Sequence, residues 1–174
     1  MTSSNGAQEC FVYIMLPGET VFITAGKFEL RKDRQGVASG RFVYGKSYRD
    51  RADAVPIDPD ELKLSERTYT NTRLKGIFGA LRDSSPDYWG RRVIEKRSGK
   101  PALGEIDYLL ESPDDRAGAL GFGLGREPPA PLRTFNQTID LERLQALADA
   151  IIADEEMPGG AEAQQAQDLL LAGT

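Results

Sequence analysis

The sequence predicts an α+β fold in which a small antiparallel β-sheet or partly open barrel is followed by a helical segment. Two observations predict it: strand-like segments separated by short turns follow one another between residues 11 and 44, and helical spacing of apolar residues begins at Leu74. Short turns join neighbouring strands in an antiparallel arrangement. The first part of the chain is therefore expected to form a meander.

Four segments are expected to be strands of this sheet. Residues 11–16 are aromatic and branched, and Pro17-Gly18 follows them as a turn signal. Apolar and charged side chains alternate near the end of residues 21–30, which is the period of a sheet with one solvated face. Residues 40–44 continue this pattern. Residues 118–124 alternate small and apolar side chains and are expected to return to the sheet.

The stretch from residue 45 to residue 72 has little periodicity. Pro56 and Pro59 exclude a helix around them. Leu62 and Leu64 are expected either to form a short strand or to cover the edge of the sheet.

Helical segments are expected from residue 74 onward. The first is predicted by an apolar stripe with the spacing i, i+3, i+4 and i+7. Its members are Leu74, Ile77, Phe78 and Leu81. Ser85 is expected to cap a second helix, with Pro86 at its first position, and Gly99 is expected to end it. A third short helix is expected over 103–110 and a fourth from Thr138.

Two regions follow from this order of elements. Residues 1–125 are expected to form a β-rich module with helices. Residues 126–174 are expected to form a linker and a helical segment, because Pro128-Pro129-Ala130-Pro131 is typical of an extended connection.

The composition excludes several classes of site. The chain has no histidine and one cysteine, so neither a Ser-His nucleophile pair, a disulfide nor a cysteine-based zinc site can be built within it. Cys10 is expected to be a buried structural thiol. No apolar run approaches the roughly 20 residues that span a bilayer, and residues 11–16 are too short for a signal peptide. We expect a cytoplasmic protein without membrane association.

The net charge of −5 is unevenly distributed. Residues 1–100 carry 18 Lys+Arg and 13 Asp+Glu, whereas residues 101–174 carry 4 and 14. Two parts of opposite potential favour docking of a protein partner. The acidic part repels phosphate, which argues against direct nucleic-acid binding.

A basic cluster is the main candidate for partner docking. It lies on the expected second helix and consists of Arg91, Arg92, Lys96 and Arg97, with Lys100 beyond them. Arg is well suited to bidentate anion binding, but such a cluster also complements the helix dipole, and Arg91 can pair with Glu95. A solvated helix face and a docking site both remain open.

Three other features favour structural roles. The glycines of 118–125 lack the spacing of a phosphate-binding loop and favour a strand. Asp114 and Asp115 favour a turn, although paired acids can also hold Mg²⁺. Trp89, beside Tyr88, favours an anchor in the core over a stacking surface for bases.

Several spaced motifs resemble one known family. The segment from Leu74 to Ile94 is similar to the hallmark of HipA-type kinases, in which two helices meet at an acidic-serine-proline junction. Residues 105–110 and 114–120 resemble a second passage of that family, and 42–44 with 54–57 resemble its sheet and following loop. The resemblance covers about residues 20–125.

The resemblance implies a role in a bacterial type II toxin–antitoxin system. Members of the family phosphorylate serine or threonine on target proteins, and a small helix-turn-helix antitoxin of the HipB type neutralises them. Their N-terminal part packs on a larger kinase core that holds ATP and Mg²⁺. The implied partners are therefore a kinase core, in cis or in trans, and such an antitoxin; formation of a homo-oligomer is left open.

For this chain alone the resemblance implies no cofactor. Residues 169–171 resemble the apolar run that leads into the family's phosphate loop, so Gly173 and Thr174 are its expected start and the cofactor-binding candidates. The chain stops there, as a truncated kinase would. Phosphoryl transfer depends on groups that position the triphosphate and its metal, so no catalysis is expected and no catalytic or metal-binding residue is carried over.

The expected function is thus the N-terminal portion of a HipA-like toxin kinase, which scaffolds the ATP-binding lobe and docks partners without being catalytic alone. The alternative is a separately encoded module that acts as a protein-binding regulator or antitoxin of a kinase core. A nucleic-acid adaptor is a weaker third hypothesis.

Overall fold

The structure is a computed structural model, and two compact units can be distinguished in it. The described residues are 7–99, 103–112, 119–129, 145–146, 148–150 and 153. Residues 7–84 and 119–129 belong to the first unit, and residues 85–99 and 103–112 belong to the second. The predicted turn at Asp114 and Asp115, the start of the fourth helix at Thr138, the run 169–171, and Gly173 and Thr174 lie outside the described residues.

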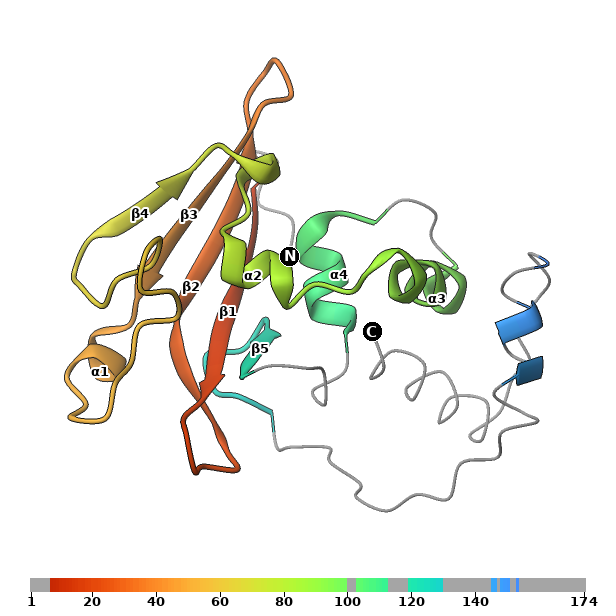
Figure 1. Ribbon diagram of the computed structural model, residues 1–174. Coiled ribbons are helices and arrows are strands. Elements are labelled where there is room, and N and C mark those ends of the chain that lie inside the picture. Colours follow the sequence, from red (N-terminus) through yellow and green to blue (C-terminus); the bar gives the residue numbers. More distant parts are fainter. Residues whose placement is uncertain are drawn as a thin grey trace. The chain divides into compact units, whose positions relative to one another are not determined.

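The first unit is built on a five-stranded antiparallel sheet with the order β4-β3-β2-β1-β5 (Figure 1). Its strands are β1 (Gln8–Met15), β2 (Phe22–Lys32), β3 (Ala38–Tyr44), β4 (Thr68–Asn71) and β5 (Leu120–Gly123). The predicted meander is confirmed by the pairing of β1 with β2 and of β2 with β3. The predicted return of the glycine-bearing segment is also confirmed, since β5 pairs with β1. The sheet is open rather than a barrel, because β4 and β5 are its edge strands among the described residues.

One face of the sheet is apolar and buried, and the other is solvated. Cys10, Phe28 and Phe42 stand opposite one another across β1, β2 and β3 on the buried face. On the other face Lys27 and Glu9 form an exposed ion pair of 2.8 Å. This alternation follows from the period of two along a strand. Burial of Cys10, with a smaller effect of the Glu9 charge, raises the pKa of its thiol to about 12, so the predicted structural thiol is confirmed.

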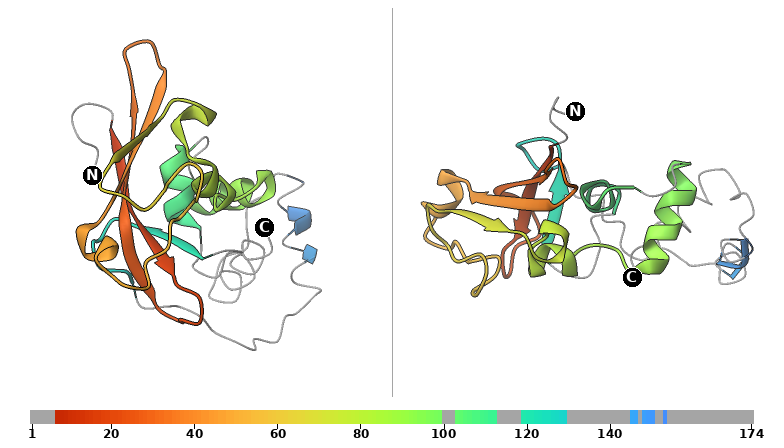
Figure 2. Two further views of the ribbon diagram at one scale, coloured as in Figure 1. Left: turned by 60° about the vertical axis from the view of Figure 1, so that its left-hand side comes forward. Right: turned by 90° about the horizontal axis from the view of Figure 1, so that it is seen from above.

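The hairpin formed by β2 and β3 is longer than its neighbours. Leu30 is the last β2 residue paired with β1, and Gly40 is the last β3 residue paired with β4 in the direction of the hairpin tip. Beyond them, the two strands of the hairpin pair with each other and with no further strand of the described residues. Figure 1 and the left view of Figure 2 show the tip projecting past the other strands.

Tyrosine hydroxyls hold the irregular segment between β3 and β4 against the sheet. Tyr44 is buried and donates to the carbonyl of Leu62 at 2.5 Å, while the N–H of Ile57 donates to the same hydroxyl at 2.7 Å. The Tyr48 hydroxyl donates to the carbonyl of Val55 at 2.8 Å, and its ring stacks on Tyr44 at 5.9 Å. These bonds satisfy loop backbone groups that no strand or helix satisfies.

The same segment contains one helix that the sequence did not predict. This helix, α1 (Lys46–Arg49), is a single turn and too short to show apolar periodicity. No helix forms around Pro56 and Pro59, as predicted. Leu62 is fully buried and forms only an isolated bridge with Asp58, so it does not belong to a predicted short strand.

The predicted continuous helix from Leu74 is wrong. Leu74, Lys75 and Gly76 form a left-handed turn, η1 (Leu74–Gly76), with φ of 49°, 58° and 82°. The chain then extends through Ile77 and Phe78 before the short helix α2 (Gly79–Asp83) begins. The turn sends Ile77 and Phe78 into the core and leaves Leu74 48% exposed, so the four residues do not form one stripe.

Two glycines and one carboxylate explain why the chain turns here. A Cβ on Gly40 would lie 1.8 Å from the carbonyl oxygen of Gly76. The two backbones can approach this closely only because glycine has no side chain. Phe78 then meets Phe28 edge-on at 6.2 Å. The Glu61 carboxylate accepts the N–H of Gly79 at 2.7 Å, which satisfies a free donor at the start of α2.

Candidate docking site on the helix pair

The second unit contains two helices, α3 (Tyr88–Ser98) and α4 (Glu105–Glu111), which carry the predicted docking residues. The carboxylate of Asp87 caps α3 by accepting the N–H of Gly90 at 2.8 Å. Gly99, with φ of 64°, ends it as predicted. The predicted cap at Ser85 is wrong. Asp87, a residue that suits the N-cap position equally well, caps the helix instead, so α3 begins after the buried Pro86.

The third helix forms close to where it was predicted. Its N-terminus is closed by Asp107, whose carboxylate accepts the N–H of Gly104 at 2.9 Å. Ile106 and Leu109 are buried, as their spacing on one helix face requires. Trp89 of α3, the expected anchor in the core, is half-buried, and Tyr88 beside it is 75% exposed.

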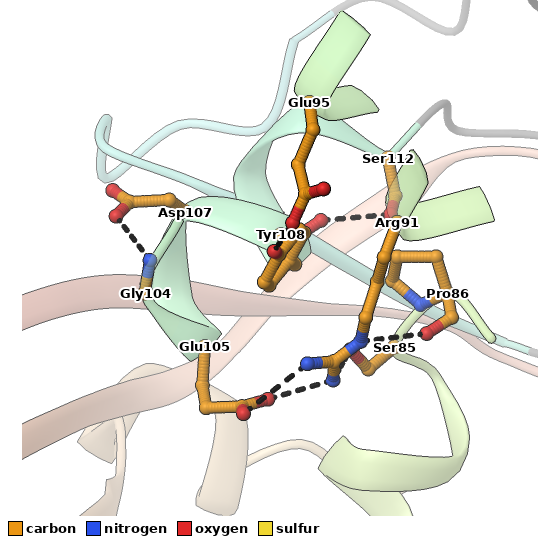
Figure 3. Close-up of polar contacts among 9 residues, drawn as sticks. All are labelled: Ser85, Pro86, Arg91, Glu95, Gly104, Glu105, Asp107, Tyr108 and Ser112. Atoms are coloured by element: carbon orange, nitrogen blue, oxygen red, sulfur yellow. Dashed lines mark hydrogen bonds and ion pairs between the residues drawn. The ribbon is translucent and has the colours of Figure 1, made fainter. Parts of the chain in front are cut away.

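Arg91 lies at the centre of the contacts between α3 and α4 (Figure 3). Its guanidinium forms a bidentate pair with Glu105, with distances of 2.7 Å from Nη2 to Oε2 and 3.2 Å from Nη1 to Oε1. The same group donates to the carbonyl of Pro86 and to the hydroxyl of Ser85. Its central carbon also lies 4.5 Å from the centre of the Tyr108 ring.

This geometry changes the expected pairing of Arg91. The i, i+4 pair with Glu95 was expected, but the bidentate partner is Glu105 on the other helix. Glu95 instead accepts a hydrogen bond from the Tyr108 hydroxyl. The hydrogen bond to Glu105 raises the pKa of Arg91 above its usual value. The pKa of Tyr108 is also raised, mainly by burial and secondly by its hydrogen bond to Glu95.

Arg97 makes a second connection between the helices. Its Nη2 donates to the carbonyl of Glu111 at 2.7 Å and lies 3.2 Å from the carboxylate of the same residue. Ser112 closes the end of α4 by donating to the carbonyl of Tyr108 at 2.8 Å (Figure 3). Two of the four predicted docking cations therefore have structural partners within the helix pair.

Arg92 and Lys96 lie about 100° around α3 from Arg91 and Glu95. Both are half-buried, and Arg92 lies 3.4 Å from the hydroxyl of the exposed Tyr88. They are one helical turn apart and can present two positive charges to the same anionic group.

The other features considered as sites are the glycines of β5, acidic metal ligands and membrane-spanning helices. Gly121 and Gly123 face the rings of Phe22 and Tyr13, so the glycines of β5 serve close packing rather than phosphate binding. Within the described part of the chain no three His, Cys, Asp or Glu side chains gather in an arrangement that could hold a metal ion. In the same part, no helix has the length and apolarity needed to cross a membrane.

Sequence reasoning missed several residues that fix these units. Glu105 was not recognised as the partner of Arg91 because the pair is 14 residues apart and depends on how α3 and α4 pack. Tyr44 and Tyr48 were not recognised as anchors of the loop. A signal was available for Tyr44, since a tyrosine on the apolar face of a strand requires a partner for its hydroxyl.

The comparison with family models decides what kind of domain this is. The model of the HipA N-terminal domain matches residues 23–123. The chain belongs to this family. The match runs from β2 to β5, so it includes α3, α4 and every strand of the sheet except β1. It also agrees closely with residues 20–125, over which the motifs resemble HipA-type kinases.

Searches of curated proteins and of solved structures found no match to the chain. An open sheet leads through a tyrosine-held loop and a left-handed turn to a pair of helices joined by Arg91, and the chain then returns to the sheet as β5.

Proposed function

We propose that this chain is the N-terminal portion of a cytoplasmic HipA-like toxin kinase of a type II toxin–antitoxin system. In this role it scaffolds the ATP-binding lobe of a kinase core and docks partners, and it does not transfer phosphate alone. The observation that carries the proposal is the match of the HipA N-terminal domain to residues 23–123.

The internal contacts of the two units support a scaffolding role. Tyr44, Tyr48 and Glu61 satisfy backbone groups of loops and helix ends, and Arg91 joins two helices through a bidentate pair. Side chains used in this way fix a backbone rather than act on a substrate. A partner such as a kinase core or a HipB-type antitoxin would therefore meet a preorganised surface, which lowers the entropic cost of docking.

The test uses a HipA-type kinase core that lacks its own N-terminal domain. Labelled γ-phosphate transfer to the core itself is measured with the core alone, with this chain alone, and with both. We expect no transfer by the chain alone and a rise in transfer when both are present. A fall in the activity of the core would instead favour the alternative role, a separately encoded regulator or antitoxin.

Binding of ATP provides a second test. Isothermal titration of the chain with ATP and Mg²⁺ is expected to give no heat of binding, because the ATP and Mg²⁺ of the family are attributed to the core. Transfer by the chain alone, or clear binding of ATP to it, would refute the proposed division of labour.

A further inference from the structure

The strand β4 forms an outer edge of the sheet in the first unit (Figure 1). It pairs with β3 on one side, and no strand of the described residues lies on its other side. Apart from its short length, β4 has none of the usual features that prevent a further strand from pairing with an edge: it contains no proline, no charged side chain and no bulge. It therefore keeps the capacity to pair with another strand.

The hydrogen bonds of the neighbouring ladder show which backbone groups of β4 face outward. The N–H of Gly45 donates to the carbonyl of Ala25 at 2.9 Å, and the N–H of Asp33 donates to the carbonyl of Val37 at 3.0 Å. These contacts lie at the two ends of the ladder between β2 and β3 and agree in phase. Hydrogen-bonded pairs alternate with other pairs in an antiparallel ladder. Counted from either end, Arg41 directs its backbone groups to β2 and not to β4.

The register of β3 and β4 then places outward backbone groups on Thr68 and Thr70. Thr70 lies opposite Arg41, and Thr68 is two residues away, so neither is in a hydrogen-bonded pair with β3. Both threonines are exposed, and outside the ladder neither forms a hydrogen bond within the described residues. Their N–H and C=O groups together offer two donors and two acceptors at the edge. An added strand requires this pattern.

The loops on either side of β4 are held against one face of the strand. The hydroxyl of Tyr69 donates to the carbonyl of Lys63 at 2.5 Å, and the amide of Asn71 donates to the carbonyl of Ile77 at 2.7 Å. Tyr69 and Asn71 alternate with the two threonines, so these contacts lie on the face opposite to the threonine side chains. They fix the position of β4 without using its outward backbone groups.

Exposed cations flank both ends of this edge. Arg67 immediately precedes β4, and Arg73 follows Asn71 by two residues. Neither side chain forms an ion pair within the described residues. The carboxylate nearest to Arg67 in the sequence, that of Glu66, pairs with Arg49 at 2.9 Å. A strand added to this edge would meet positive charge at both ends, which favours carboxylates on that strand.

The two faces of β4 favour different residues on an added strand. On the solvated face, the exposed Arg41 stands beside Thr70 and has no ion-pair partner in the part of the chain described. Its neighbour on β2, Glu29, pairs instead with Arg31. A Glu opposite Thr70 would lie two strand spacings from Arg41, about 10 Å between Cα atoms, which the two side chains can span. On the other face a branched apolar residue would pack beside the ring of Tyr69.

We propose that the outer edge of β4 binds an extended acidic segment of another protein as a further strand, with carboxylates on alternate residues and branched apolar residues between them. Backbone hydrogen bonds to Thr68 and Thr70 hold the segment, and the three arginines select its carboxylates. Pairing with a second copy is disfavoured, because its β4 brings the same unpaired cations to the interface. The proposal does not depend on the kinase role, since it concerns only this edge.

The test measures fluorescence anisotropy of a fluorescein-labelled peptide of about eight residues in which Glu and Val alternate, titrated with the full chain. We expect salt-dependent binding. Thr70→Pro is expected to weaken it roughly tenfold or more, because proline removes an outward N–H while the ladder with β3 keeps its bonds. Arg67→Glu combined with Arg73→Glu is expected to weaken it by a similar factor, since two attractive charges become repulsive. Circular dichroism checks that each variant is folded.

Two controls separate strand addition from attraction by charge alone. Lys32→Glu with Arg34→Glu, at the exposed tip of the hairpin, changes the net charge as much as the double arginine variant and is expected to alter the affinity less than twofold. The peptide is also N-methylated on one or the other set of alternate residues. One methylated peptide is expected to bind roughly tenfold or more weakly and the other nearly as before, because a strand directs alternate N–H groups to opposite sides.

The proposal would fail if the two methylated peptides bound equally, or if folded Thr70→Pro bound as well as the unchanged chain. It would also fail with an equal loss in the hairpin control, or with no binding at several hundred micromolar chain. A dimer of the chain in light scattering that Thr70→Pro dissociates would assign the edge to a second copy and overturn the proposal. Should Thr70→Pro not fold, the two methylated peptides decide the question without it.

Discussion

Removal of a single hydroxyl, by Tyr44→Phe, tests whether the tyrosines hold the loop between β3 and β4. The ring would remain in place, since Phe fits the same space, but the N–H of Ile57 and the carbonyl of Leu62 would both lose their partner. A buried backbone group without a partner costs about 1–3 kcal/mol, so the two together are expected to lower the free energy of unfolding by about 2–6 kcal/mol. This is a large part of the stability of a typical domain.

Urea denaturation followed by circular dichroism measures the effect. The matched control is Tyr69→Phe. The Tyr69 hydroxyl donates to the carbonyl of Lys63 at 2.5 Å in an exposed position and lies 2.8 Å from the Ser65 hydroxyl, and its removal is expected to cost about 0.5–1 kcal/mol. Water can replace that bond but cannot reach the buried groups. If the two variants lose the same stability within 0.5 kcal/mol, the argument that Tyr44 anchors the loop is refuted.

The pH dependence of the same variant gives a further check. Burial raises the pKa of Tyr44 from 10.0 to about 12, so the folded state holds this proton more tightly than the unfolded state does. The stability that it contributes is fully present below pH 10 and is lost as the pH rises toward about 12. Tyr44→Phe should remove this part of the alkaline decline, while the raised pKa of Tyr48 leaves a smaller decline in both proteins.

Three further variants or reagents test other parts of the structure. Gly40→Ala places a Cβ 1.8 Å from a backbone oxygen of η1 and should cost more than about 3 kcal/mol in urea unfolding, whereas Gly45→Ala, with its nearest contact at 3.7 Å, should cost under about 1 kcal/mol. Arg91→Lys keeps the charge but loses the bidentate hydrogen bonding to Glu105. Thermal unfolding should show a loss of about 1–2 kcal/mol in stability, which raised salt should reduce only in part. Cys10, with its pKa near 12, should react with a thiol reagent at neutral pH only as fast as the chain unfolds; rapid labelling of folded protein would contradict its burial.

The sequence predicts those parts of the fold that depend on local pattern. Alternation located β2 and β3, and the glycine-bearing strand predicted over 118–124 was correctly placed in the sheet, where β5 covers Leu120–Gly123. Gly99 ended α3 as its conformational freedom suggested. Such signals reside in a few neighbouring residues, so they need no knowledge of tertiary contacts.

Prediction failed where a distant contact overrides the local pattern. The spacing of Leu74, Ile77 and Phe78 is that of a helix, yet the touching backbones of Gly76 and Gly40 require a turn of opposite hand. Those glycines are 36 positions apart, and the spacing of apolar residues contains no information about their approach. The pairing of Arg91 with Glu105 was missed for the same reason.

The failed helix and the exposed leucine have one cause, and this links the fold to its surface. A right-handed helix from Leu74 would have buried that residue beside Ile77 and Phe78 and left no aliphatic side chain next to the hairpin. The left-handed turn instead separates them, so that Ile77 and Phe78 complete the core while Leu74 remains exposed. A variant that restored right-handed geometry would therefore lose the contact between Gly40 and Gly76 and should unfold at a lower concentration of urea. Leu74→Ala, by contrast, should leave the free energy of unfolding nearly unchanged, because Leu74 is exposed.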